Sequence, residues 1–158
     1  MGKNSIKQEM IFTIDNKKAL MDTNIIVYSN DTTEADKHLI TKKFLKTIVT
    51  SHDIFISVQN LGEFSRIITE KISRPLSYNK AKEMITNYSN AFKTITYSEK
   101  TILRALTLKS ESNLHFWDSL IVATMEENSI NTIITENEKD FRKVKWIKII
   151  NPFKKNNM

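Results

Sequence analysis

Acidic residues at the ends of expected strands and the starts of expected helices are the part of this sequence best suited to chemistry. Five acids stand at such positions: Asp22, Glu63, Asp118, Glu136 and Asp140. Carboxylates that lie together repel, and each raises the pKa of its neighbours unless a cation compensates. A set of carboxylates with no cysteine suits a hard cation, Mg²⁺ or Mn²⁺. One or two such ions can activate water and hold a scissile phosphate, which is the chemistry of phosphodiester hydrolysis.

Each acid taken alone has a simpler interpretation. Asp22 is typical of a turn or helix cap that follows a strand, and Glu63 of a solvated helix face. Asp118 could be a first-turn acid that interacts with the helix dipole, and Asp140 could cap the segment before Phe141. Only their joint placement predicts a site, and that placement depends on the fold.

The elements that must position these acids alternate along the chain. Short β-rich apolar runs predict strands at 18–22, 53–57, 93–96, 132–135 and 146–150. Apolar residues at helical spacing predict helices at 33–51, 58–73, 79–90, 99–108 and 116–128. This alternation implies an α/β fold, with parallel strands and helices on both faces of the sheet. The carboxyl ends of the strands and the starts of the following helices then share one edge, where the acids converge.

Single side chains give further expectations about these helices. Ser57 and Ser98 are suited to be N-caps, and Pro75 is expected to end the helix that begins after Ser57. Beside Asp118, an apolar stripe is expected to be buried: Trp117, Leu120, Ile121 and Met125.

Composition limits the class of protein. The 158 residues suit one domain with a substantial core. The absence of cysteine excludes disulfides and thiolate chemistry, and two glycines exclude a glycine-rich phosphate loop. No apolar stretch approaches the ~20 residues of a membrane span, and no secretory signal is visible, so a cytoplasmic protein is expected. The net charge of +6 favours an anionic partner such as nucleic acid, although it could serve solubility alone.

Five stretches resemble the PIN-domain ribonucleases, especially VapC-like toxins of type II toxin–antitoxin pairs. They are 20–28 (LMDTNIIVY), 56–64 (ISVQNLGEF), 116–123 (FWDSLIVA), 133–137 (IITEN) and 149–153 (IINPF), in family order and spacing. The third is the most specific. The resemblance covers 18–153, which we expect to be the nuclease domain, between an extension at 1–17 with an added strand and a basic tail at 154–158.

The resemblance implies a PIN-like three-layer fold with a central, mostly parallel sheet of four to five strands. It also implies an endoribonuclease that depends on Mg²⁺ or Mn²⁺, acts on RNA, forms a homodimer and is silenced by a cognate antitoxin. By this resemblance Asp22, Glu63 and Asp118 are the catalytic and metal-binding acids. The polar residues that would support them are Thr23, Asn24, Ser119 and Thr135.

The fourth acid is less defined, because this chain has Asn137 where some relatives have an acid. Other relatives have Asn there and an Asp-Phe pair slightly later, as in Asp140-Phe141. Strand alternation from Thr135 points Glu136 away from the site and Asn137 toward it. Asp140 lies on the same face as Asn137 if a helical turn begins there. We therefore predict Asp140 as the fourth acid and Asn137 as an outer-shell ligand, with Glu136 as the alternative.

Three other interpretations remain open at this stage. The same acids would suit a housekeeping ribonuclease or a structure-specific DNA nuclease. The third is an RNA- or protein-binding module that has lost catalytic activity, although the presence of all three acids, Asp22, Glu63 and Asp118, argues against such a loss. For the expected homodimer, the aromatic residues Tyr78, Tyr88 and Phe92 could face a partner on the central helical hairpin, or could pack inside the monomer.

Overall fold

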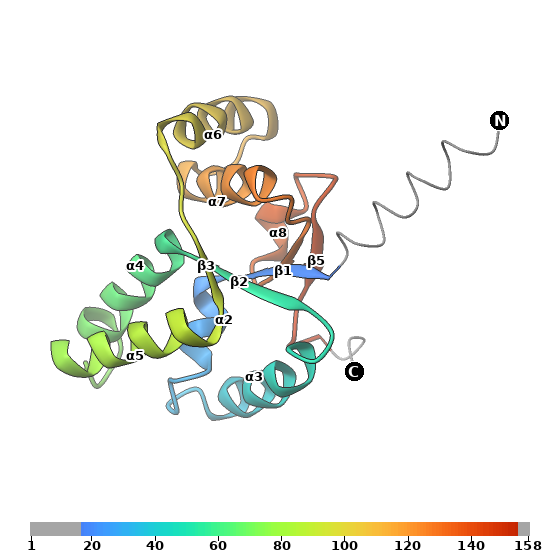
Figure 1. Ribbon diagram of the computed structural model, residues 1–158. Helices are drawn as coiled ribbons and strands as arrows, with labels where there is room; N and C mark the ends of the chain where they lie inside the picture. The colour runs from blue at the N-terminus through green and yellow to red at the C-terminus, as the bar shows by residue number, and fades with distance from the viewer. Residues whose placement is uncertain (1–16, 155–158) are drawn as a thin grey trace.

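The computed structural model describes residues 17–154, which contain five strands with helices between them (Figure 1). The strands are β1 (Lys18–Met21), β2 (Asp53–Ser57), β3 (Lys93–Ile95), β4 (Thr132–Ile134) and β5 (Lys148–Ile150). The helices are α2 (Thr23–Tyr28), α3 (Ala35–Ile48), α4 (Val58–Arg66), α5 (Tyr78–Ala91), α6 (Glu99–Ser112), α7 (Phe116–Glu127) and α8 (Glu138–Phe141), with a π-helical turn η1 (Ile67–Lys71) after α4. The strand expected within 1–17 and most of the basic tail lie outside the described residues.

The five strands form one parallel sheet in the order β3-β2-β1-β4-β5. The central strand β1 has Leu20 opposite Phe55 of β2 and Ile133 of β4. Strands covered on both faces read as continuous apolar runs, which explains the Ala-Leu-Met and Thr-Ile-Ile sequences of β1 and β4. The α/β class and the parallel sheet predicted from the alternating elements are confirmed.

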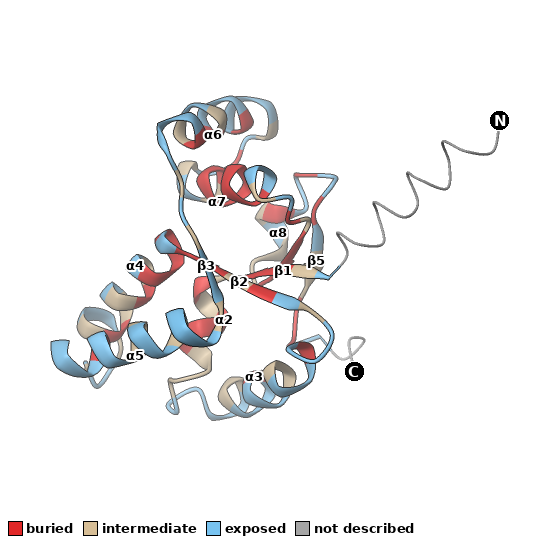
Figure 2. Ribbon diagram, in the orientation of Figure 1, coloured by how far each residue is buried: buried red, intermediate tan, exposed pale blue. Residues whose placement is uncertain are grey.

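Helices cover both faces of the sheet and make two cores. Leu20 and Ile133 face a core built with α6, α7 and α8, whereas Met21 and Ile134, the next residues along, face a core built with α2 to α5. Alternation along each strand therefore divides the apolar residues between two layers. Figure 2 shows the buried residues gathered on α7 and the central strands, while α5 is exposed over most of its outer surface. No helix within residues 17–154 has the length and apolarity to cross a membrane.

The sequence prediction missed the short helix α2. Its apolar residues Ile25, Ile26 and Val27 are consecutive and β-branched, so they show no helical period and have low helix propensity. Burial of all three holds them in the helix. Asp22 begins it as the N-cap, since its side chain accepts a hydrogen bond from the Thr23 backbone.

Two helix ends also differ from the prediction. Helix α4 ends at Arg66, and the chain continues as the π-helical turn η1 to Lys71. The helical segment after Ser57 therefore ends before Pro75. Helix α6 continues beyond the predicted end at residue 108 to Ser112, where Asn113 caps it with a φ of 50°, in the left-handed region that closes helices. The predicted cap Ser57 is confirmed, because its hydroxyl accepts from the backbone N–H of Asn60.

The predicted burial of Trp117 is wrong. Its side chain is 59% exposed, whereas Leu120, Ile121 and Met125 are buried as expected. Trp117 lies one turn before Ile121 on the same face of α7, in the first turn of the helix. The packing that buries Ile121 has ended at that turn.

Candidate active site

The carboxylate of Asp22 stands at the carboxyl end of the central strand and is held by three hydrogen bonds. Its Oδ1 accepts from the backbone N–H of Thr23 at 2.7 Å. Its Oδ2 accepts from the Thr135 hydroxyl at 2.6 Å and from Asn24 Nδ2 at 3.1 Å. These donors come from the start of α2 and the end of β4, so pairing of β1 with β4 builds this part of the site.

The second acid, Glu63, is brought to the same edge by α4. Its Oε2 accepts from the hydroxyl of Thr23 at 2.7 Å, and that hydroxyl in turn accepts from Asn60 Nδ2 at 3.1 Å. Asn60 is fixed by Ser57, whose hydroxyl and backbone N–H both donate to Asn60 Oδ1. The capping residues of α4 therefore also position its acid relative to Asp22.

Gln59 ties Glu63 to helix α7. Its Nε2 donates to Glu63 Oε1 and to the backbone carbonyl of Trp117, each at 3.0 Å. Its Oε1 is buried and has no hydrogen-bond partner in the part of the chain that the structure describes. Sequence reasoning missed Gln59, although its i, i+4 spacing to Glu63 on a helix could have indicated a contact.

Asp118 reaches the site from the first turn of α7. The neighbouring Ser119 is buried, and its hydroxyl donates to the carbonyl of His115 at 3.0 Å. The hydroxyl of Ser119 is thus engaged with the backbone of its own helix, whereas Thr23, Asn24 and Thr135 contact the acids directly.

The carboxylates interact through their charges. Burial, together with the nearby charges of Glu63 and Asp118, raises the pKa of Asp22 to about 6, against the hydrogen bonds from Thr135 and Thr23, which lower it. Burial also raises the pKa of Asp118, with Asp140 and Glu63 adding to the rise. The three acids predicted as a trio therefore share one electrostatic environment.

Asp140 and Glu136, the two candidates for a fourth acid, lie in different surroundings. Asp140, on α8, is the strongest charged neighbour of Asp118, and ion pairing with Lys143 at 3.0 Å lowers its own pKa together with a hydrogen bond from Asn137. The backbone N–H of Asn137 donates to the Thr135 hydroxyl, which places Asn137 beside the Asp22 network.

Glu136 turns the other way, toward α2 and α3. Its carboxylate accepts from Lys37 Nζ and from the Tyr28 hydroxyl, both at 2.7 Å. Burial disfavours its charge, but these two hydrogen bonds outweigh burial and lower the pKa of Glu136. The structure thus brings Asp140 to the acid cluster and leaves Glu136 outside it.

The donor set fits a hard divalent cation. Such an ion stabilises the charged form of partly buried carboxylates that lie close together. Within residues 17–154, no group of three or more His, Cys, Asp or Glu side chains is arranged to hold a metal by itself. Mg²⁺ is commonly bound by one or two carboxylates together with waters and substrate phosphates, so Asp22 with Glu63 or Asp118 suits it.

The fold is shared with solved bacterial toxins. A toxin–antitoxin complex from Klebsiella pneumoniae is 23% identical with a TM-score of 0.63, and the match covers 86% of this chain and 98% of that chain. VapBC2 from Rickettsia felis, bound to a DNA fragment from its promoter, is 18% identical with a TM-score of 0.64, over 85% of this chain and 98% of that chain. VapC20 from Mycobacterium tuberculosis, described as a sarcin-ricin loop cleaving toxin, is 12% identical with a TM-score of 0.58, over 73% of this chain and 86% of that chain.

The sequence supports the same assignment. A comparison with curated protein sequences finds no match. The family model described as the PIN domain, however, matches residues 19–147, which contain strands β2 to β4, all of β1 but its first residue, and all four acids of the cluster. The resemblance seen in the motifs is confirmed, and the chain belongs to the PIN domain family of nucleases.

Proposed function

We propose that the protein is a metal-dependent endoribonuclease that hydrolyses RNA phosphodiester bonds and serves as the toxin of a toxin–antitoxin pair. The observation that carries the proposal is the convergence of Asp22, Glu63 and Asp118, which come from three separate segments and interact through their charges. Burying like charges together costs stability, so their presence at one edge is best explained by a cation that they hold.

In this mechanism Asp22 with Glu63 or Asp118 would hold the ion together with waters and the substrate phosphate, and the remaining acids, with Asp140 as the fourth, would act on the ion through its waters. When bound, the ion supplies an activated water and neutralises charge on the phosphate. Both oxygens of Glu63 are fixed, one by Gln59 and one by Thr23, and both oxygens of Asp22 accept hydrogen bonds. The two carboxylates are therefore held in one orientation before a substrate arrives, which is the condition for precise positioning of reacting groups.

RNA is the substrate we favour. The net charge of +6 suits a polyanion, and one structural neighbour carries the description of a sarcin-ricin loop cleaving toxin. A structure-specific DNA nuclease with the same acids is the competing proposal, and digestion of matched RNA and DNA by the purified protein separates the two.

An antitoxin is the proposed protein partner, because the structural neighbour from Klebsiella pneumoniae is a toxin–antitoxin complex. Helix α3 offers a surface for a partner, since an apolar groove of about 630 Å³ is lined by Leu39, Ile40, Phe44 and Pro152. Both partners would meet in the cytoplasm.

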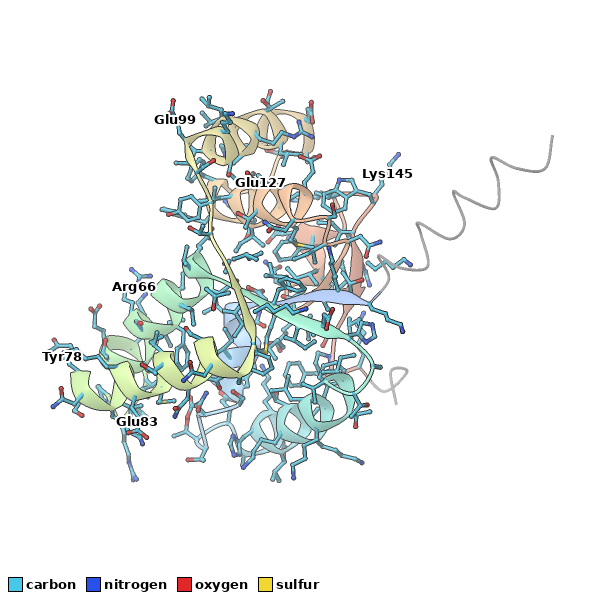
Figure 3. All side chains as sticks on the ribbon, in the orientation of Figure 1. Arg66, Tyr78, Glu83, Glu99, Glu127 and Lys145 are labelled. Atoms are coloured by element: carbon cyan, nitrogen blue, oxygen red, sulfur yellow. The ribbon has the colours of Figure 1, made fainter. Side chains whose placement is uncertain are left out.

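A homodimer is also proposed, through α5. Tyr78 stands at the outer end of this helix (Figure 3) and is 75% exposed. Tyr88 and Phe92 are half-buried against the monomer core, with Tyr88 packed on Phe64, so only Tyr78 of the three aromatics is free for a partner. Sedimentation as an 18.4 kDa species at all concentrations would contradict the dimer.

The test of the function is the set of variants Asp22→Asn, Glu63→Gln and Asp118→Asn. Each should lose nearly all RNA cleavage while its circular dichroism and elution volume stay those of the folded protein. Glu83→Gln, which changes an exposed acid of α5, is the matched control and should stay active. EDTA should stop cleavage and added Mg²⁺ or Mn²⁺ should restore it; cleavage that persists in EDTA excludes this mechanism.

A further inference from the structure

Trp117 exposes a large aromatic surface at the acid cluster. Its side chain is 59% exposed, while the preceding Phe116 packs against the core beneath α6 and α7. The two rings meet edge to face, with centroids 5.2 Å apart and an interplanar angle of 74°. One exposed apolar residue is ordinary on a protein surface, so the position of this ring matters more than its exposure.

The backbone of Trp117 is fixed to the site. Its carbonyl accepts a hydrogen bond from Gln59 Nε2, and the same amide group holds Glu63. The next residue along α7 is Asp118, which lies about 1.5 Å farther along the helix axis and about 100° around it. The backbone of Trp117 therefore lies at the same end of the sheet as the acids, and its indole leaves the helix next to Asp118, about 100° around the axis.

The charges around Asp118 suit a nucleotide. Asp118 has basic as well as acidic neighbours, since His115 and Lys143 lie near enough to lower its pKa. A phosphate bound at the acids through a cation would also meet these basic groups, and the base attached to that nucleotide must lie to one side. Aromatic side chains bind unpaired bases by stacking, because every base has an apolar face.

We propose that Trp117 is a stacking platform for a nucleobase next to the scissile phosphate, and that it helps to select the nucleotide at which the chain is cut. This inference rests on the proposed cleavage of RNA. It adds to that function a residue that binds the base, whereas the acids act only on the phosphate.

The location of Trp117 favours a base over a protein partner as its occupant. The apolar groove on α3 and the exposed Tyr78 on α5 belong to the layer on the opposite face of the sheet from α7. Trp117 is separated from those surfaces, and its backbone is joined through Gln59 to the acid Glu63 instead. A group that stacks on it is thus within reach of the reacting phosphate.

The experiment tests whether the ring of Trp117 contacts one particular base of the RNA. Trp146→Phe leaves Trp117 as the single tryptophan of the chain, so its fluorescence reports directly on binding. Short single-stranded RNA is titrated with Ca²⁺ in place of Mg²⁺, so that a hard cation is available to the acids, and a gel verifies that the RNA stays intact. A series of RNAs carries one abasic nucleotide at successive positions. Trp117→Leu and Trp117→Tyr, which keeps an aromatic face, lack this reporter, so the same series is measured for all three proteins by the fluorescence anisotropy of end-labelled RNA.

RNA should quench Trp117 emission, and Trp117→Leu should weaken binding by about 5- to 150-fold, the range for loss of one stacked base. At one position, removal of the base should weaken RNA binding to the protein with Trp117 by a similar factor. The same abasic RNA should bind Trp117→Leu as tightly as intact RNA does. Trp117→Tyr should keep most of the affinity for intact RNA. In the presence of Mn²⁺, Trp117→Leu should also shift the preferred cleavage site.

Two results would overturn the inference in different ways. If the wild-type protein binds no RNA, the proposed function fails and the inference fails with it. If RNA binds and is cleaved, but each abasic position reduces the affinity of wild type and of Trp117→Leu by the same factor, the inference alone is wrong. A change of sedimentation coefficient in Trp117→Leu together with equal penalties would assign the ring to a protein interface.

Discussion

The hydroxyl of Thr135 donates a 2.6 Å hydrogen bond to Asp22, across 113 residues of sequence. It lowers the pKa of Asp22 against the effect of burial, and it links the ends of β1 and β4. Thr135 thereby keeps the central carboxylate both oriented and easier to ionise.

Thr135→Val should weaken metal binding because it removes this donor while keeping the shape of the side chain. Loss of a partner that orients a metal-binding group commonly costs 10- to 100-fold in affinity, and we expect a loss in that range for Mn²⁺ by isothermal titration calorimetry. Thr132→Val is the matched control: Thr132 begins the strand that Thr135 follows, and its hydroxyl donates to Asn131. Equal affinities in the two variants would remove Thr135 from the site.

The metal-free protein should lose stability as the pH rises. Asp22 has a pKa of about 6 when folded and about 3.9 when unfolded, so between these values the folded state binds the extra proton. Stability from this group is present below about pH 4 and is lost by about pH 6, a change of about 3 kcal/mol.

Asp22→Asn removes that penalty. In EDTA, its melting temperature relative to wild type should therefore increase steadily from pH 4 to pH 7, whereas the exposed Asp36→Asn control should show a constant difference. Saturating Mg²⁺ at pH 7 should reverse the order, since only the wild type gains stability from the ion. A difference between Asp22→Asn and wild type that is independent of pH would contradict the burial effect.

Gln59→Met should separate stability from metal binding. The variant loses two hydrogen bonds but also removes an oxygen that is buried without a partner among the described residues. These effects oppose each other, so the free energy of unfolding should change by no more than about 1 kcal/mol. Glu63 loses one of its two anchors, and Mn²⁺ affinity should fall. Unchanged affinity with a large loss of stability would show that Gln59 serves only the packing of α4 on α7.

Asp140→Asn and Glu136→Gln test the fourth acid. Asp140 acts on Asp118 through its charge, so its variant should lose metal affinity by about 10- to 100-fold. Glu136 is paired with Lys37 and Tyr28, so its variant should bind the metal as wild type does. The opposite pattern in calorimetry would assign the fourth position to Glu136.

The sheet and the convergence of acids followed from local patterns. Strand β2 was predicted with its observed bounds, because Asp53–Ser57 combines β-branched residues with a capping serine at its end. Once parallel strands alternate with helices, topology alone brings Asp22 and Asp118 to one edge. Neither step requires knowledge of side-chain contacts.

The contacts around the acids could not be read from local patterns. The consecutive β-branched residues of α2 carry no helical period, and only burial in the folded protein makes them helical. The contact between Gln59 and the carbonyl of Trp117 joins residues 58 apart, and no spacing rule links them. Trp117 fits the apolar stripe of α7 by period, yet it lies one turn beyond the packing that covers the stripe.

The central position of β1 bears on when the protein becomes active during its synthesis. Strand β1 and helix α4 are made early, so Asp22 and Glu63 can meet while much of the chain is still missing. The bond from Thr135 to Asp22 spans 113 residues, and contacts across such long loops form late. A growing chain therefore has its first acids long before it has a complete site, and we expect any cleavage to begin only when translation is almost finished.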